Sequence, residues 1–416
     1  MSRLIFHVDV NNAFLSWEAT KRVKQGESDL RLVPSAIGGD RESRRGVILA
    51  KSIPAKLCGV KTGEPIAIAL GKCPSLYLAK PDFTLYQASS AAFVEVCKKY
   101  APIVEQFSID ECFLDMSGTA RLYPDPIEIA STIKNEIRDT LGFTVNVGIG
   151  PNKLLAKMAS DFEKPDRIHT LFANELAEKF HPLPVGALFG VGHATAQRLV
   201  SAGIRTIGEL AATDSSRLCG IFGTKMGEHL WRYANGIDDS PVVAEAEEAK
   251  GYSNSTTLAK DVISFDEAHK ILLSLCDSVA SRMRRDGRRA YCVCVTIRGN
   301  DFKDLSHQRK LSSPTDVTLE IFEITKRLFF ELWDKRTPLR LLGVALTELS
   351  GEEPEQISMF AETEKNEKEK EIDKIIDDIR EKFGSDTIVR GSTMQYSKNV
   401  AKKHKASDDL KSHIKK

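Results

Sequence analysis

Two adjacent carboxylates, Asp110 and Glu111, interrupt a stretch that otherwise predicts two apolar strands, residues 103–107 and 112–116. Neighbouring side chains of a strand point to opposite faces, but at a strand end or a tight bend both can turn toward one point. Because burying charge without a partner is costly, the pair indicates a bound cation. A solvated acidic hairpin tip explains this stretch alone equally well.

A third carboxylate, Asp9, ends the apolar run of residues 4–8, about a hundred residues before the pair. If the two strands share one sheet, Asp9, Asp110 and Glu111 could converge. Hard oxygen ligands suit Mg²⁺, which leaves positions free for phosphates and water. Two such ions would activate an attacking hydroxyl and stabilise a leaving pyrophosphate. The lysines considered for neutralising a triphosphate are Lys56, Lys61, Lys153, Lys157 and Lys164.

The flanking segments predict the elements that must position these groups. Apolar periodicity alternates between strands and helices, which favours an α+β layout with a sheet backed by helices. Residues 20–78 predict a small separate lobe, with a short helix over 55–65. The main elements expected are a strand at 4–10, helices at 13–19, 88–100 and 126–141, a strand at 143–150 and a helix at 153–161.

From residue 171 to about 240 the pattern changes to short helices only. At its centre, Gly190 and Gly192 join two predicted helices, which is the sequence form of a helix-hairpin-helix. Such glycines let backbone N–H groups at a helix N-terminus approach a phosphate closely. A plain tight turn is the alternative. A polar, Glu-rich linker follows at 241–250.

Residues 251–349 predict strand, helix, strand, strand, helix, strand, and the basic residues gather at 282–310. Because few acids oppose them in the sequence, we favour a surface that tracks a phosphate backbone over a merely solvated basic face. The arginines expected to contact DNA are Arg284, Arg285, Arg288, Arg289, Arg298 and Arg309. Together with the hairpin and the carboxylates, this surface indicates phosphoryl transfer at a DNA end.

The bulk properties are those of a soluble protein with about two to four domains. The chain has 416 residues, 42% hydrophobic and 28% charged, and its net charge of +1 hides the contrast between basic 282–310 and acidic 352–381. No apolar run approaches the ~20 residues of a membrane span, and the N-terminal apolar run stops at Asp9, unlike a signal peptide. We expect the eight cysteines to be reduced thiols of a cytoplasmic protein.

Three motifs carry a resemblance to a known family. Residues 9–14, 108–115 and 147–157, with Lys164-Pro165, resemble the Y-family DNA polymerases, most closely the bacterial DNA polymerase IV type. The resemblance covers residues 4–360 and implies an α+β multidomain fold shaped as a right hand. Its parts would be a palm (1–15 and 79–170), small fingers (16–78), an all-helical thumb (171–240), the linker (241–250), a βαββαβ little finger (251–350) and a C-terminal tail (351–416).

The resemblance also implies roles for single residues. Asp9, Asp110 and Glu111 would be metal ligands, joined by the backbone carbonyl of Val10. Phe14 would be the aromatic steric gate that excludes a ribose 2′-OH, although without the motif it reads as a core phenylalanine. Positions that would bind the nucleotide triphosphate are Lys56 and Lys164. A peptide that docks on a sliding clamp would be formed by Gln356, Met359 and Phe360 within 356–360.

Four positions depart from the family pattern. Ile53 stands where a tyrosine usually bonds the triphosphate, and Lys56 replaces an arginine, which loses the bidentate fork. Ala13 is smaller than the aromatic often found beside the gate, and Asn11 replaces a frequent aspartate. These departures concern the fingers-side contacts and leave the carboxylates intact.

The sequence therefore predicts a DNA-directed DNA polymerase for low-fidelity translesion synthesis. It would use dNTPs, primer-template DNA and two Mg²⁺ ions, act as a monomer away from membranes, and bind a sliding clamp. One alternative is a catalytically weak accessory protein that binds DNA or the clamp with a polymerase body. A second is another palm-type enzyme such as a nucleotidyl cyclase, which has no use for the thumb and little-finger segments.

Overall fold

The structure is a computed structural model that describes residues 3–39, 46–244, 248–351, 363–384 and 387–394. The chain divides into two compact units, of which the first contains residues 3–39 and 47–244 and the second most residues from 248 onward. Within the described ranges, no helix combines the length and apolar content that crossing a membrane requires.

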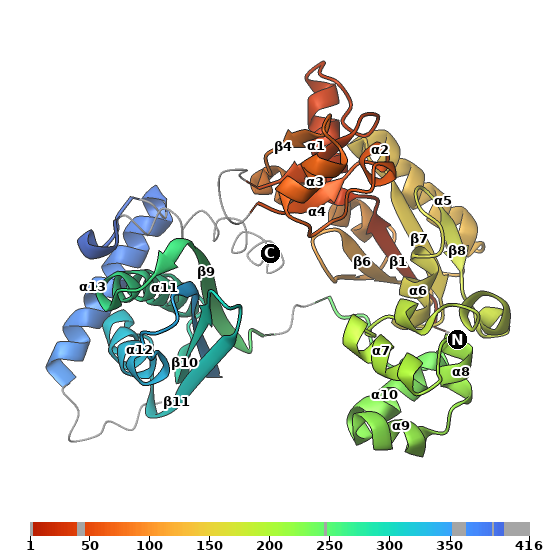
Figure 1. Cartoon of the computed structure of the whole chain (residues 1–416). Helices are drawn as coiled ribbons and strands as arrows, with labels where there is room; N and C mark the ends of the chain where they lie inside the picture. The colour runs from red at the N-terminus through yellow and green to blue at the C-terminus, as the bar shows by residue number, and fades with distance from the viewer. Residues whose placement is uncertain (1–2, 40–45, 245–247, 352–362, 385–386, 395–416) are drawn as a thin grey trace. The chain divides into compact units, whose positions relative to one another are not determined.

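The first unit is built on a five-stranded sheet in the order β5-β6-β1-β7-β8 (Figure 1). The central strand β1 pairs antiparallel with β6 on one side and with β7 on the other. The strands are β1 (Ile5–Val10), β5 (Ile103–Gln106), β6 (Glu111–Asp115), β7 (Val145–Gly150) and β8 (Ile168–Thr170). The predicted meeting of the Asp9 strand and the Asp110-Glu111 hairpin in one sheet is confirmed by this pairing.

One face of this sheet packs on the main apolar core, and the other carries polar side chains. Phe6 and Val8 of β1 belong to the main core, which packs against three helices and is filled by large side chains such as Trp17 and Tyr86. Because strand residues alternate, His7 and Asp9 point to the opposite face. The helices of the main core are α1 (Ala13–Lys24), α4 (Phe83–Lys98) and α5 (Pro126–Glu136), which continues into the π-helical turn η1 (Ile137–Leu141).

A single helix, α6 (Lys153–Ser160), covers the opposite face beside β1 and β7. Its approach is so close that a Cβ atom added at Gly148 would lie 2.0 Å from the carbonyl oxygen of Ala156. Only glycine fits there, so α6 can pack in direct contact with β7 on the polar face of the sheet. That contact places the side chains of α6 next to His7 and Asp9.

A small lobe carries the three-stranded sheet β3-β2-β4. The short helix predicted within residues 55–65 is confirmed as α2, which ends at Leu57 before two left-handed glycines, Gly59 (φ 84°) and Gly63 (φ 82°). Such glycines end helices rather than continue them. The lobe contains β2 (Ser35–Gly38), β3 (Ile48–Lys51), α2 (Ile53–Leu57), α3 (Ile66–Lys72) and β4 (Tyr77–Ala79).

Residues 171–240 are helical, as predicted, and share an apolar core with Leu154, Leu155, Met158 and Ala159 of α6. The segment before Gly190 is shorter than predicted, however, since it forms only the 3₁₀ turn η4 (Val185–Ala187) rather than a helix. The regular helices are α7 (His193–Ser201), α8 (Ile207–Ala212), α9 (Ser215–Phe222) and α10 (Thr224–Ala234), and the short turns are η2 (Ala173–Glu175) and η3 (Leu176–Phe180).

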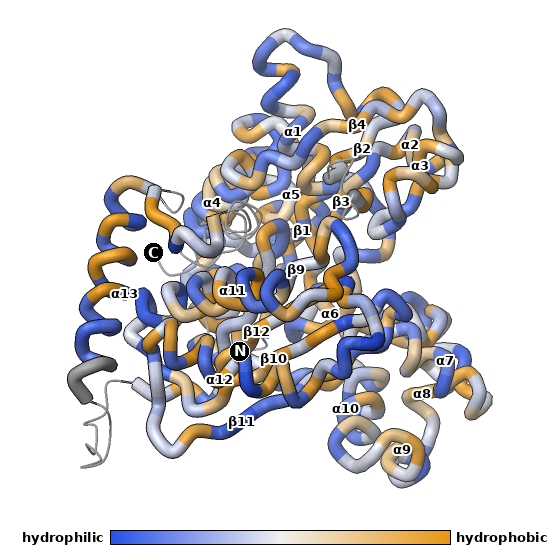
Figure 2. The backbone as a smooth tube through the Cα atoms, turned by 60° about the vertical axis from the view of Figure 1, so that its left-hand side comes forward, coloured by the Kyte–Doolittle hydropathy of each residue, from blue (hydrophilic) through white to orange (hydrophobic). Residues whose placement is uncertain are grey.

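The second unit has the predicted βαββαβ order and a four-stranded antiparallel sheet, β11-β10-β12-β9. The core between α11, α12 and the sheet includes Val279, Phe329 and Val293. Strand β11 lies at the sheet edge, and Figure 2 shows much of it as hydrophilic. The elements are β9 (Gly251–Val262), α11 (Phe265–Arg285), β10 (Arg289–Gly299), β11 (Asp304–Thr315), α12 (Thr318–Leu332) and β12 (Leu339–Ser350).

The last long helix, α13 (Thr363–Phe383), packs on α11 and α12 through its polar side chains. Its apolar side chains do not form its most buried face, since Ile372 is 45% and Phe383 72% exposed. Asp373 is buried instead and forms ion pairs with Arg284 and Arg390. The short 3₁₀ turn η5 (Gly391–Thr393) follows.

Candidate active site at the junction of β1 and β6

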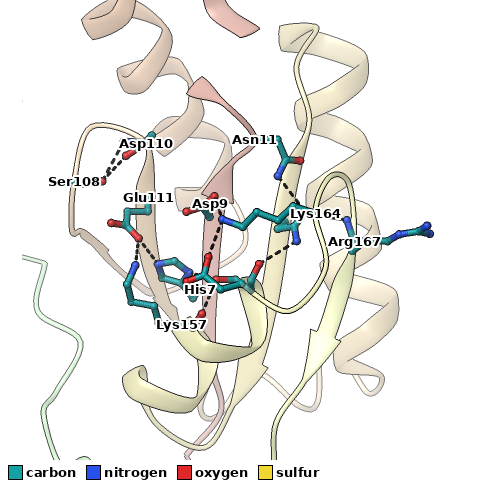
Figure 3. Close-up of polar contacts among 12 residues, drawn as sticks. His7, Asp9, Asn11, Ser108, Asp110, Glu111, Lys157, Lys164 and Arg167 are labelled. Atoms are coloured by element: carbon teal, nitrogen blue, oxygen red, sulfur yellow. Dashed lines mark hydrogen bonds and ion pairs between the residues drawn. The ribbon is translucent and has the colours of Figure 1, made fainter. Parts of the chain in front are cut away.

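Asp9 and Glu111 face each other across neighbouring strands. They are paired residues in the antiparallel register of β1 and β6, and both side chains point toward α6 (Figure 3). Their side chains keep 17% and 15% of their surface exposed, respectively. The pair is therefore nearly buried yet reachable from solvent, as a binding site for a charged ligand requires.

Glu111 is held by two donors from the polar face. His7 Nε2 lies 2.8 Å from Oε2 of Glu111, and the Lys157 ammonium contacts the same oxygen. Burial raises the pKa of Glu111, but the hydrogen bonds from His7 and Lys157 outweigh it and lower this pKa to about 2. Among the described residues Oε1 has no hydrogen-bond partner, so one oxygen of an ionised carboxylate remains available.

His7 is a positioning residue that the motifs did not reveal. It is fully buried, and its Nδ1 lies 2.7 Å from Ser160 Oγ at the end of α6. Burial lowers the pKa of His7 despite the hydrogen bond to Glu111, which favours a neutral ring. Since a carboxylate only accepts, Nε2 carries the proton and donates it to Glu111. Its place two residues before Asp9 in a strand was the available signal, because that spacing shares a face.

Asp9 has a different environment. Its Oδ1 accepts a 2.7 Å hydrogen bond from Lys164, which also pairs with Asp161 at 2.8 Å. Burial raises the pKa of Asp9 to about 6, and the attraction of Lys164 offsets only part of that rise. For Lys164, burial alone would lower the pKa, but Asp9 and Asp161 outweigh it and raise it.

Asp110 directly precedes β6, and its negative charge adds to the effect of burial in raising the pKa of Asp9. Ser108 Oγ donates a 2.7 Å hydrogen bond to its Oδ1, and its backbone carbonyl accepts from the N–H of Val10 at 2.9 Å. In the part of the chain that the structure describes, no three acidic, histidine or cysteine side chains are gathered closely enough to hold a metal. Asp9 and Glu111 are thus paired across the two strands, while the convergence of all three carboxylates on a metal stays a prediction.

The donor set at this junction nevertheless fits a hard divalent cation. Asp9 and the free oxygen of Glu111 are carboxylate ligands, which Mg²⁺ prefers. Two lysines now contact these carboxylates, and a cation could take over that neutralising role. Ser108 engages only Oδ1 of Asp110, and among the described residues no hydrogen bond engages the other carboxylate oxygen, so Asp110 could serve as a third carboxylate ligand.

The five candidate lysines separate into three groups. Lys157 and Lys164 contact the carboxylates, as described above. Lys153 is engaged by Glu105, with Nζ 2.6 Å from Oε1, and it stacks over the ring of Phe113. Lys56 and Lys61 are exposed in the small lobe. Only the first group touches the site in this structure.

Phe14 lies on α1, directly after the end of β1. Its ring stacks on Tyr86 with centroids 4.7 Å apart, and it also contacts Trp17 and Phe83 edge-on or tilted. It is only partly buried, so one side of a rigidly held ring remains accessible. In the small lobe, Ile53 is 58% exposed at the first turn of α2, where a larger polar residue would also be tolerated.

The glycines of the predicted hairpin precede α7. Gly190 has φ 85°, and Gly192 is the N-cap of the helix with open space where a Cβ atom would be. This arrangement leaves the backbone before α7 approachable, which is what contact with a phosphate requires.

The arginines of the second unit differ from the expectation that few acids oppose them. Arg284 is nearly buried and donates to Asp377 at 2.7 Å. We therefore assign it to holding α13 rather than to contacting DNA. Ion pairs are also formed by Arg288 with Glu248, Arg298 with Asp304, and Arg309 with Glu331. The other two predicted arginines differ in exposure: Arg285 is exposed and Arg289 is partly exposed.

The predicted clamp-binding residues Gln356, Met359 and Phe360 lie outside the described residues.

Comparisons with known proteins agree with the fold and extend over the whole site. Residues 8–161 match the model of the impB/mucB/samB family, residues 249–359 that family's C-terminal domain, and residues 186–238 the thumb domain of DNA polymerase iota. A DNA polymerase IV of Clostridium acetobutylicum is 45% identical, with 95% of this chain and 99% of the relative covered. One of Clostridium kluyveri is 37% identical, with 96% and 100% covered.

A solved structure shows the same fold. A Y-family DNA polymerase chimera superposes with a TM-score of 0.73 at 23% identity, covering 84% of this chain and 99% of the chimera. The predicted fold class, an α+β right hand with thumb and little finger, is confirmed by this match and by the thumb-domain match. The exact domain boundaries stay predictions.

Proposed function

This chain belongs to the impB/mucB/samB family of Y-family DNA polymerases, and on that premise we propose that Asp9, Asp110 and Glu111 hold the metal ions of its active site. It is a DNA-directed DNA polymerase of the translesion type. The alternative of a catalytically weak accessory protein is not favoured. The observation that carries the proposal is the facing pair of Asp9 and Glu111, held by His7, Lys157 and Lys164.

Y-family polymerases use divalent metal ions, and we propose two Mg²⁺ ions bound by these carboxylates and by the Val10 carbonyl. When bound, such ions lower the pKa of the primer 3′-hydroxyl and neutralise the departing pyrophosphate. The residues of the chain then have separable tasks. His7 keeps Glu111 oriented with Oε1 free, and Ser108 orients Asp110 through a hydrogen bond to its Oδ1.

We propose that Lys164 contacts the triphosphate of the incoming dNTP. Its ammonium group now neutralises Asp9, and a cation at Asp9 would release it toward the phosphates that arrive with the nucleotide. Lys56, exposed on α2, is proposed as a second contact that supplies charge but no bidentate fork.

Phe14 is proposed as the gate against a ribose 2′-OH. Contacts with Tyr86 and Trp17 fix the ring of Phe14, so a ribose 2′-oxygen would clash with a side chain that cannot move away. Phe14→Ala should raise ribonucleotide incorporation while deoxynucleotide incorporation is retained. Unchanged sugar selectivity in primer extension would remove Phe14 from this role.

The metal assignment can be tested at Asp110, whose Oδ1 accepts a hydrogen bond from Ser108. Asp110→Asn should abolish primer extension with Mg²⁺ and leave binding of primer-template DNA intact, because charge is lost without a change of shape. Asp115→Asn is the matched control, since Asp115 lies at the far end of β6 and caps the backbone N–H of Ser117. Extension by the Asp110 variant at the rate of the control would reject Asp110 as a ligand.

We further propose that the chain binds primer-template DNA through Gly190, Gly192, Arg285, Arg288, Arg289, Arg298 and Arg309. Because these are contacts to phosphates, substituting any one of these arginines by alanine should weaken DNA binding about equally for all sequences and reduce the salt dependence of binding.

For the sliding clamp, alanine at Gln356, Met359 and Phe360 together should abolish stimulation by the clamp and leave clamp-free extension unchanged. Retained stimulation would contradict the clamp proposal.

A further inference from the structure

We propose that Asn146, together with Asn11, is the positioning residue that fixes the segment 160–167 and thereby aims Lys164 at Asp9 and at the nucleotide. The inference rests on the triphosphate role proposed for Lys164. It concerns a buried amide pair that neither the carboxylate motifs nor the metal chemistry uses.

Asn146 connects β7 to this segment through every polar atom of its side chain. It is fully buried, and its Nδ2 donates to the carbonyls of Ser160 at 3.0 Å and Glu163 at 2.6 Å. Its Oδ1 accepts from the N–H of Arg167 at 3.1 Å. A buried amide with all its bonds satisfied is a rigid support, and its bonds lie on both sides of Lys164.

Asn11 completes the arrangement from the end of β1. Its Nδ2 donates to Asn146 Oδ1 at 3.1 Å, and its Oδ1 accepts from the N–H of Asp166 at 2.9 Å (Figure 3). Asn11 is two residues from Asp9, so the same strand end carries the carboxylate and one anchor of the lysine segment. Four backbone groups around Lys164 are thus tied to two side chains.

The pattern explains why position 11 carries an amide. Two carbonyls fix Nδ2 of Asn146, so its Oδ1 must face Asn11 and needs a donor there. A carboxylate has no hydrogen to donate, and aspartate at position 11 would place oxygen against oxygen in a buried site. Asn11→Asp is therefore a nearly isosteric change that acts on the pair and removes no volume.

The test measures KM for dNTP and kcat in primer extension by the full chain with Mg²⁺. Asn11→Asp should raise KM for dNTP about tenfold, the scale of one misplaced charge-assisted hydrogen bond, with a smaller change in kcat and unchanged DNA binding. Asn146→Ala should do the same, and thermal unfolding identifies any variant that fails to fold. Asn235→Asp, which removes donors to the carbonyls of Ala211 and Trp231, is the matched control and should leave KM unchanged.

A double-mutant cycle with Lys164→Ala separates the possible failures. If the amide pair acts through Lys164, Asn11→Asp should change KM less than about twofold in the Lys164→Ala background. An equal rise of KM in both backgrounds, or no rise with Asn11→Asp while Lys164→Ala raises KM, would overturn the positioning role alone. An unchanged KM with Lys164→Ala would instead contradict the triphosphate contact itself, and the positioning role with it.

Discussion

Asp9 and Glu111 lie opposite each other, yet their partners give their carboxyl groups opposite pKa shifts. Glu111 receives two hydrogen bonds on one oxygen, which outweigh burial, and its pKa falls to about 2. Asp9 has only Lys164, which is shared with Asp161, so burial prevails and its pKa rises to about 6. The two groups therefore differ: Glu111, with a pKa of about 2, is ionised near neutral pH, whereas the ionisation of Asp9 depends on pH.

The pH dependence of metal binding follows from Asp9. Because its folded pKa is raised, the folded state favours the protonated acid, and ionising Asp9 costs stability as pH rises from about 4 through about 6. A cation needs the ionised form, so Mn²⁺ affinity without DNA should be about tenfold weaker at pH 5 than at pH 7, as a pKa of about 6 dictates.

Glu111 cannot contribute to this change, since its pKa of about 2 leaves it ionised across the whole window. The measurement is a Mn²⁺ titration followed by electron paramagnetic resonance at several pH values. Asp9→Asn serves as the control and should bind weakly with no pH dependence between pH 5 and 7. A flat wild-type profile over that range would argue against Asp9 as a ligand.

His7 supports the same site without touching the cation. Replacing it by leucine removes the donor to Glu111 and should lower metal affinity or extension rate roughly 10–100-fold, the usual cost of losing a group that orients a ligand. His7→Gln retains an N–H donor and should recover part of the loss. Wild-type metal affinity and rate in the leucine variant, measured by Mn²⁺ titration and single-turnover extension, would exclude the positioning role.

At the scale of elements, the site depends on one register and one close contact. The pairing of β1 with β6 sets Asp9 opposite Glu111, and Gly148 in β7 lets α6 approach closely enough for Ser160 to reach His7. Much of this was predictable: the strands and the helix over 153–161 follow from apolar periodicity, whereas the pairing of β1 with β6 in one sheet was only a condition of the predicted convergence.

What the sequence did not predict depends on contacts between distant segments. The buried partners His7 and Asn146 carry no motif, and their roles appear only when α6 lies across the sheet. The packing of α13 likewise depends on partners from other elements. Hydrophobic periodicity marks its isoleucines, whereas Asp373 is buried by ion pairs with Arg284 and Arg390.

The polar docking of α13 can be tested by removing its most buried charge. Asp373 is 1% exposed and accepts from Arg284, Arg390 and the N–H of Thr318. Asp373→Ala leaves these cations without their partner and should destabilise the second unit by about 3 kcal/mol. Chemical denaturation followed by circular dichroism measures the change. Asp378→Ala, at an exposed residue of the same helix, is the control and should shift stability by less than about 0.5 kcal/mol. Equal losses of stability in the two variants would show that the buried ion pairs of Asp373 do not hold α13 in place.

At the scale of the whole molecule, we propose that the two units supply different parts of one activity. The first contains the carboxylates, the proposed nucleotide contacts and the helical segment with Gly190 and Gly192. The second presents a sheet with a hydrophilic edge strand and several arginines (Figure 2).

The central claim is that the carboxylates at the junction of β1 and β6 bind the cations for nucleotidyl transfer. The most direct test is Glu111→Gln, which keeps shape and hydrogen bonding but removes charge, measured by single-turnover primer extension with saturating dNTP and Mg²⁺. We predict a loss of at least about a hundredfold in rate, together with weakened Mn²⁺ binding and unchanged affinity for primer-template DNA. Extension at the wild-type rate by this variant would contradict the account.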